Sequence, residues 1–200
     1  MRLLRTAHSE LPWRIHELTR DFTVEDVWAL PTPGGPDDLK WLVGQLAEGI
    51  RGGMGGDTPL SRLLFAVRWK LGALLGWDKS DAGVGSRVPS LRDRLPADLL
   101  EGLRGPDLGA NKFSSLYQRQ DEWAAEMANR TVHAVLHIGW VPDGSGGYHG
   151  QMAVLVKPNG RFGGLYMAAI KPFRYLGVYP ALIRGIGREW QASRPERSSH

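Results

Sequence analysis

The sequence contains no cysteine, and this absence excludes disulfide bonds and thiolate chemistry. A chain of this kind suits a reducing compartment, so we expect a cytoplasmic protein. No run of eighteen apolar residues occurs, so we expect no membrane-spanning helix. Residues 1–14 also hold no apolar stretch as long as that of a signal peptide.

Several sequence motifs with known chemistry are missing as well. No GxGxxG follows a predicted strand, and the glycine-rich segment 51–57 is not followed by the GK[ST] of a phosphate-binding loop. There is no GxSxG, so the sequence offers no nucleophile motif of the serine-hydrolase kind. These absences lead us to expect no cofactor.

The charge balance argues against a nucleic-acid partner. The 25 Lys and Arg residues exceed the 21 Asp and Glu residues by only four, and the two signs are interspersed. With 42% hydrophobic and 23% charged residues, the chain has the composition of a globular protein. We expect a single domain over residues 1–200, with frayed tails at 1–11 and 192–200.

Tryptophan is abundant: eight residues carry this large apolar ring. Most of these rings must be at least partly buried, because each exposes a large apolar area when it is in water. They indicate either a thick core or the lining of an apolar cavity.

The first half of the sequence predicts short strands followed by helices. We predict strands at 13–18 and 24–30, a break at 31–36, and a helix over 39–50 from its apolar spacing. A second helix is predicted over 59–75, with Pro59 at its first position. Residues 77–109 are rich in Gly, Pro, Asp and Arg and predict a loop with one short helix near 95–103.

The second half predicts an antiparallel meander. A strand at 113–119 precedes segments joined at Asn129-Arg130, at the loop 142–147, and at Asn159-Gly160, which suits a two-residue hairpin turn. These turns pair Trp123 with Leu136, Leu136 with Met152, and Met152 with Met167. One apolar face results, formed by Trp123, Met127, Val132, Leu136, Ile138, Met152, Val154, Leu165 and Met167.

A helix is predicted to end the chain. Apolar residues between 173 and 190 have helical spacing, and Pro180 marks a kink or a fresh start. A sheet with one apolar face favours a helix across that face. The sequence therefore predicts an α+β fold with a curved antiparallel sheet, a long C-terminal helix, and two or three helices between the early and late strands.

The other face of the meander carries two Glu–His pairs. The same register places Glu126 opposite His133 and Glu122 opposite His137, with Cβ atoms about 5 Å apart. A carboxylate orients an imidazole and raises its pKa, as a general base requires. The alternative is that both are ion pairs on the solvent face of the sheet. No single metal site uses all four, because residues four apart on a strand are separated by ~13 Å.

Three stretches of the sequence, 63–78, 122–144 and 157–174, resemble a bacterial domain family of unknown function. Members of that family stand alone or follow an epimerase-like dehydrogenase domain. The resemblance covers roughly residues 13–190. It implies kinship with START-like, helix-grip proteins, in which a curved sheet grips a long C-terminal helix around an apolar cavity. The family implies no catalytic residues.

Two functional hypotheses follow, and a structural or homo-oligomer-forming module is a third. The first is binding of an apolar small molecule between the sheet and the last helix, with the lining Trp123, Leu136, Trp140, Met152, Met167 and Trp190. The second is an enzyme of the cyclase, isomerase or dehydratase kind. In that hypothesis the acid–base groups are His133, His137, Glu122 and Glu126.

Overall fold

The fold is that of a computed structural model, which describes residues 1–51, 84, 88–108, 113–128, 132–159 and 179–193. It is an α+β structure around an open antiparallel sheet of five strands. The strands are β1 (Thr23–Ala29), β2 (Ser114–Gln118), β3 (Glu122–Ala128), β4 (Val132–Pro142) and β5 (Tyr148–Pro158). Their order across the sheet is β1-β5-β4-β3-β2, so the meander from β2 to β5 is confirmed and β1 joins it beside β5.

The hairpin between β4 and β5 has a different register from the predicted one but keeps the predicted faces. Leu136 pairs with Val154 and Trp140 with Gly150, two residues away from the partners that the sequence predicted. The predicted register was wrong because the turn is shorter: Pro142 pairs with Tyr148, and the Asp143 side chain accepts hydrogen bonds from the backbone within the turn. A shift of two residues leaves every side chain on its predicted face.

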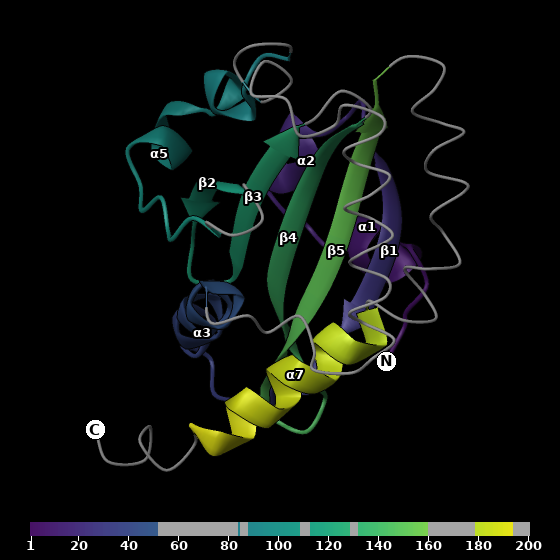
Figure 1. The fold of residues 1–200 in the computed structure, drawn as a ribbon, viewed down its shortest axis with the longest axis vertical. Coiled ribbons are helices and arrows are strands. Elements are labelled where there is room, and N and C mark those ends of the chain that lie inside the picture. The colour runs from purple at the N-terminus through teal and green to yellow at the C-terminus, as the bar shows by residue number, and fades with distance from the viewer. Residues whose placement is uncertain (52–83, 85–87, 109–112, 129–131, 160–178, 194–200) are drawn as a thin grey trace.

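One end of one sheet face is covered by two helices, α3 (Leu39–Arg51) and α7 (Tyr179–Ala192). Both were predicted, and Pro180 is the second residue of α7, where its missing N–H costs no hydrogen bond. In Figure 1, α7 runs across one end of the sheet and α3, seen nearly end-on, lies next to it. We call this the apolar face, and its residues on the strands are Trp28, Trp123, Ala125, Leu136, Ile138, Trp140, Met152 and Val154.

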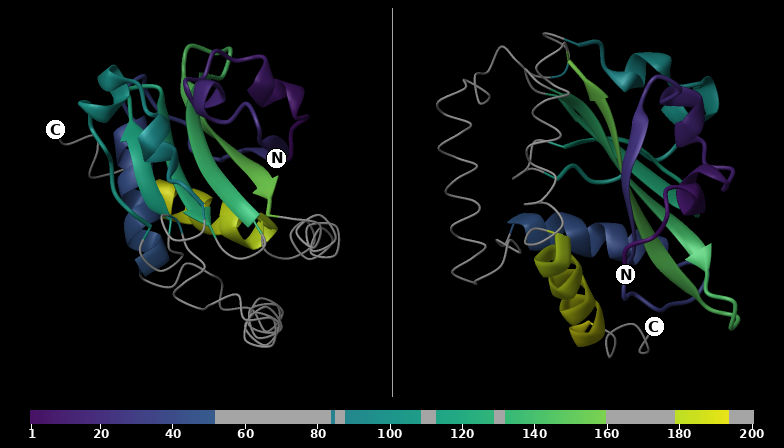
Figure 2. Two further views of the ribbon diagram at one scale, coloured as in Figure 1. Left: turned by 90° about the horizontal axis from the view of Figure 1, so that it is seen from above. Right: turned by 90° about the vertical axis from the view of Figure 1, so that its right-hand side faces the viewer.

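The opposite face is covered by α1 (Thr6–Ser9) and α2 (Ile15–Leu18), which are single helical turns, and by residues 91–100. Figure 2 shows the N-terminal turns on the side of the sheet away from α3 and α7. The predicted strand at 13–18 is therefore wrong. A helical turn places Ile15 and Leu18 on one side, three residues apart, and buries both against the sheet.

The N-terminal segment 1–11, which the sequence predicted as a frayed tail, makes backbone hydrogen bonds with β1. The backbone N–H of Leu3 donates to the Val27 carbonyl at 2.9 Å, and the Ala29 N–H donates to the Met1 carbonyl at 2.8 Å. These bonds extend the sheet beyond β1. They hold α1 over the face opposite α3 and α7, with His8 fully buried.

The segment before β2 contains a 3-10 turn, η2 (Leu91–Arg94), and a single α-helical turn, α5 (Ala97–Leu100). The predicted short helix near 95–103 corresponds to α5, and the strand predicted at 113–119 is β2. The predicted helix at 59–75 and the Asn159-Gly160 hairpin with Leu165 and Met167 lie outside the described residues. No helix in the described part of the chain has both the length and the apolar character needed to cross a membrane.

Candidate functional site

The candidate site lies on the sheet face under α1, α2 and η2. We call it the histidine face, and it is formed by Glu122, Glu126, His133, His137, Gly139 and Gln151, with His8 and Trp13 from the N-terminal turns. Both predicted Glu–His pairs form there. The interpretation as solvent-face ion pairs is wrong, because all four side chains are at most 5% exposed.

The pairs are diagonal rather than directly opposite. Glu122 lies across from Gly139 and Glu126 across from Val135, since the β3–β4 ladder is displaced by two residues from the predicted one. Diagonal neighbours on a sheet are still within reach of long side chains. Accordingly, His137 Nε2 lies 3.0 Å from Glu122 Oε2, and His133 Nε2 lies 2.8 Å from Glu126 Oε2.

Glu122 accepts hydrogen bonds from two donors besides His137. The Tyr117 hydroxyl donates to its Oε2 at 3.0 Å, and the backbone N–H of Arg14 donates to its Oε1 at 2.9 Å. Burial would raise the pKa of Glu122, but the hydrogen bond and charge of His137, with the Arg14 and Tyr117 donors, outweigh burial and hold that pKa below its usual range. Glu122 is therefore a carboxylate at neutral pH.

A third residue, His8 of α1, extends the Glu122–His137 pair. Its Nε2 lies 3.1 Å from His137 Nδ1, and the two rings meet edge to face with centroids 4.9 Å apart. Burial lowers the pKa of His137 more than the neighbouring Glu122 raises it. The pKa of His8 falls to about 2, first through burial and then through the charges of His137 and His16.

These charge states fix the direction of each hydrogen bond. The Glu122 carboxylate can only accept, so His137 donates from Nε2 and has its lone pair at Nδ1. His8 must then donate from Nε2 to that lone pair, which leaves its own Nδ1 unprotonated. The histidine face thus contains a Glu122–His137–His8 relay that ends at the buried His8 Nδ1, whose lone pair is free of partners among the described residues.

The second pair is built differently. Glu126 accepts from the His133 ring, from the Ser90 hydroxyl, and from the Leu91 backbone N–H at 3.0 Å. Burial raises the pKa of Glu126, but these three donors together hold it below its usual range. Because Ser90 bonds the carboxylate and not the imidazole, the three residues do not have the order of a Ser–His–acid triad. The arrangement anchors η2 to the sheet.

The predicted lining of an apolar cavity lies on the apolar face. Trp123, Trp140, Met152 and Trp190 are at most 3% exposed and pack into one core, whereas Leu136 is only partly buried. Met167 lies outside the described residues. Indole N–H groups in this core donate to backbone carbonyls of the loop after β1, Trp140 to Gly35 at 2.8 Å and Trp190 to Pro33 at 2.9 Å.

Sequence reasoning missed His8, because its segment was expected to fray. The only signal was a lone histidine beside a short apolar stretch, and a single helical turn is too short to give a periodic pattern. His16, predicted on a strand, lies on α2 and contacts the His8 carbonyl at 3.3 Å. Within the described ranges, no group of three or more His, Asp or Glu side chains is arranged to hold a metal ion.

Comparison with known proteins places this architecture in a family. The family model described as "Protein of unknown function (DUF2867)" matches residues 18–181, which is most of the chain. The chain belongs to the DUF2867 family. This confirms the resemblance to a domain family of unknown function. The match to DUF2867 begins at the last residue of α2, so His8 and Trp13 lie before the matched segment. No curated protein and no solved structure matches the chain.

Proposed function

We propose that the protein is an enzyme of the isomerase, cyclase or dehydratase kind, and that the Glu122–His137–His8 relay transfers a proton to and from its substrate. The observation that carries the proposal is the buried, unprotonated Nδ1 of His8 at the end of two hydrogen-bonded steps from a carboxylate. Titratable groups with strongly shifted pKa values cluster at functional sites.

The relay accounts for how a histidine of such low basicity can accept a proton. When a proton arrives at His8 Nδ1, the proton on His8 Nε2 passes to His137 Nδ1, and the one on His137 Nε2 passes to Glu122 Oε2. The net change is neutralisation of the Glu122 carboxylate, and no imidazolium is left in the buried site. This avoids the free-energy cost of burying an isolated cation. The reverse transfer returns the proton to the substrate.

Access to the relay depends on α1. This element is one helical turn whose outer residues, Thr6 and Ser9, are exposed while His8 faces inward. A single turn gains little from its own hydrogen bonds, and short surface elements open at a small fraction of the global unfolding free energy. A substrate would therefore reach His8 Nδ1 through local opening beside α1 that leaves the hydrogen bond between His8 Nε2 and His137 Nδ1 in place.

The protonation pattern of the relay can be tested without a substrate. In ¹⁵N NMR spectra of the histidine rings, His8 and His137 should both show the Nε2–H tautomer and remain neutral from pH 8 to pH 5. The variant Glu122→Gln should disturb both rings, whereas Glu126→Gln should affect His133 and leave His8 unchanged. If His8 and His137 titrate near pH 6.5 like free imidazoles, the relay does not exist and the proposal is lost.

The activity itself can be tested by hydrogen–deuterium exchange. Small ketones and hydroxy acids are incubated with the protein in D₂O, and loss of the C–H signal next to the carbonyl is followed by ¹H NMR. Removing a general base typically lowers the rate by about 10²- to 10⁴-fold, so Glu122→Gln should do so. The matched substitution Glu126→Gln should retain the exchange rate. An equal loss in both variants would contradict the assignment to Glu122.

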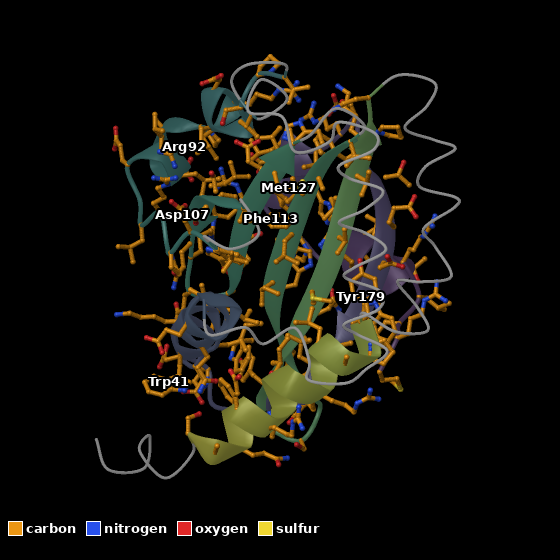
Figure 3. All side chains as sticks on the ribbon, in the orientation of Figure 1. Trp41, Arg92, Asp107, Phe113, Met127 and Tyr179 are labelled. Atoms are coloured by element: carbon orange, nitrogen blue, oxygen red, sulfur yellow. The ribbon has the colours of Figure 1, made fainter. Side chains whose placement is uncertain are left out.

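A second candidate function, binding of an apolar small molecule, is favoured by one feature of the apolar face. Beyond α3 and α7, Phe113, Met127, Leu136 and Val154 are only partly buried, and Figure 3 shows Phe113 and Met127 over that half of the sheet. Such a patch suits a lipophilic ligand. The binding hypothesis also includes kinship with START-like, helix-grip proteins, in which an apolar cavity lies between the sheet and the C-terminal helix.

The binding hypothesis is tested by native mass spectrometry of the protein from its own host and by a thermal-shift screen of lipophilic metabolites. A ligand should raise the melting temperature by several degrees in the wild type. The variant Leu136→Trp, which fills the patch, should abolish the shift. A protein that binds no compound in the screen would eliminate this candidate.

A further inference from the structure

Three buried polar atoms on the histidine face lack a hydrogen-bond partner among the described residues. They are His8 Nδ1, Trp13 Nε1 and Gln151 Oε1. Their residues are 0%, 7% and 3% exposed, so the bulk solvent does not reach these atoms. Buried polar groups in folded proteins are nearly always paired, and an unpaired one costs about 1–3 kcal/mol. Three together need a physical explanation.

The three residues are neighbours in the structure. The Gln151 side chain donates from Nε2 to the carbonyl of Ala7, the residue before His8, at 3.2 Å. Gln151 also pairs across the strands with Gly139. A Cβ on Gly139 would lie 2.6 Å from Cζ2, 2.8 Å from Cη2 and 3.1 Å from Cε2 of Trp13, so the six-membered ring of the indole packs on this point of the sheet.

The Trp13 ring also lies close to both histidine rings of the relay. The Trp13 ring centroid lies 6.5 Å from that of His8 and 5.2 Å from that of His137. All three unpaired atoms therefore belong to side chains that surround the end of the relay. Their placement follows from α1 and α2, which bring His8 and Trp13 onto the Gly139–Gln151 pair of the sheet.

Their hydrogen-bonding characters define what they can bind. His8 Nδ1 and Gln151 Oε1 are acceptors, and Trp13 Nε1–H is a donor. A cation such as ammonium cannot accept the hydrogen bond from the indole N–H. An anion would be repelled by the lone pairs of His8 Nδ1 and Gln151 Oε1. A neutral molecule that donates twice and accepts once satisfies all three. Water has this pattern and is small enough for a fully buried position.

We infer that His8, Gln151 and Trp13 bind one water molecule, and that this water is the co-substrate of the relay. The inference rests on the proposed function and narrows it to addition or elimination of water. A water proton passes to His8 Nδ1 and on to Glu122, while the water oxygen bonds to an electron-poor carbon of the substrate. The electron pair displaced from that carbon's double bond takes a proton back from the relay. Elimination of water follows the same steps in reverse.

The water site is tested by a high-resolution crystal structure and by NMR. We expect one ordered water about 2.7–3.2 Å from each of the three atoms, and a water-to-indole cross-relaxation signal at Trp13. The variants Trp13→Phe and Gln151→Met should each lose that water while keeping the Glu122–His137–His8 tautomers. A direct hydrogen bond between the indole and Gln151 Oε1, with no water between them, would overturn the site.

The role of the water is tested separately, in H₂¹⁸O with unsaturated and hydroxylated carbonyl compounds. Incorporation of ¹⁸O into product, with at least a tenfold loss in Gln151→Met, supports the inference. Glu122-dependent deuterium exchange without ¹⁸O incorporation overturns it and leaves the proposed function standing. An ordered water in a protein whose histidines titrate near pH 6.5 overturns the proposed function, and the role of the water with it.

Discussion

On the apolar face, β3–β5 meet α3 and α7 through large apolar side chains, and the Trp140 and Trp190 indoles donate to backbone carbonyls of the loop after β1. On the histidine face, the same strands meet single helical turns through a carboxylate, several imidazoles and an amide. Under α3 and α7 the apolar face excludes solvent by packing and two indole hydrogen bonds. The histidine face also requires defined charge states, which is typical of a functional site rather than of a core.

The largest expected effect comes from the apolar face. Trp190 is fully buried and donates to the Pro33 carbonyl, so Trp190→Ala leaves a large cavity between α7 and the sheet. We expect a loss of about 3–5 kcal/mol in the free energy of unfolding, measured by urea denaturation. The matched control is Trp41→Ala on α3. Because Trp41 is 39% exposed, this substitution should lower the free energy of unfolding far less. Equal losses would show that α7 does not close this face.

The histidine face should make stability depend on pH, which the apolar face cannot do. His8 and His137 have lowered pKa values in the folded protein, so the unfolded chain binds their protons more readily. Their contribution to stability is complete above the unfolded pKa of about 6.5 and is lost as the pH falls below it. Between pH 7.5 and 5.5 the loss from His8 is about 1.4 kcal/mol, and His137 acts in the same direction.

Urea titrations at those two pH values measure the effect. The variant His8→Gln keeps a donor for His137 Nδ1 but removes one titrating group, so the loss of stability between the two pH values should become smaller by about 1.4 kcal/mol. The lowered pKa of Glu122 acts only below its ordinary value of 4.5, outside this window. The partly buried His149 also has a lowered pKa, and it contributes equally to both proteins. An unchanged pH dependence in His8→Gln would show that His8 is not neutral in the fold.

The same contrast explains what the sequence could predict. Alternation along β3, β4 and β5 assigned side chains to faces correctly even though both registers were displaced by two residues, because a strand repeats with period two. The Glu–His pairs survived that error, since diagonal neighbours remain within reach. His8 was missed and Trp13 was wrongly predicted in a strand, because the single helical turns α1 and α2 beside them have no period to recognise and take their conformation from tertiary contacts.

A last prediction compares the faces through one added methyl group on each. A Cβ on Gly139, on the histidine face, would lie 2.6 Å from the Trp13 ring, which is held between the sheet and the His8 and His137 rings. On the apolar face, a Cβ on Gly150 would lie 2.7 Å and 3.0 Å from terminal methyls of Leu42 and Leu30, and 3.2 Å from the Thr32 hydroxyl. A leucine methyl can rotate away, whereas a buried indole can move only as a unit.

We therefore expect Gly139→Ala to cost about 1–3 kcal/mol and Gly150→Ala less than about 1 kcal/mol, measured by urea denaturation at pH 7.5. Gly139→Ala should also shift the Trp13 indole signal and weaken the His8–His137 contact, which ¹⁵N NMR reports, whereas Gly150→Ala should leave the histidine rings unchanged. If Gly139→Ala is tolerated with unchanged histidine spectra, then the Trp13 ring is loosely held. In that case the histidine face would be a set of adjustable contacts, and the preorganisation that the relay requires would be missing.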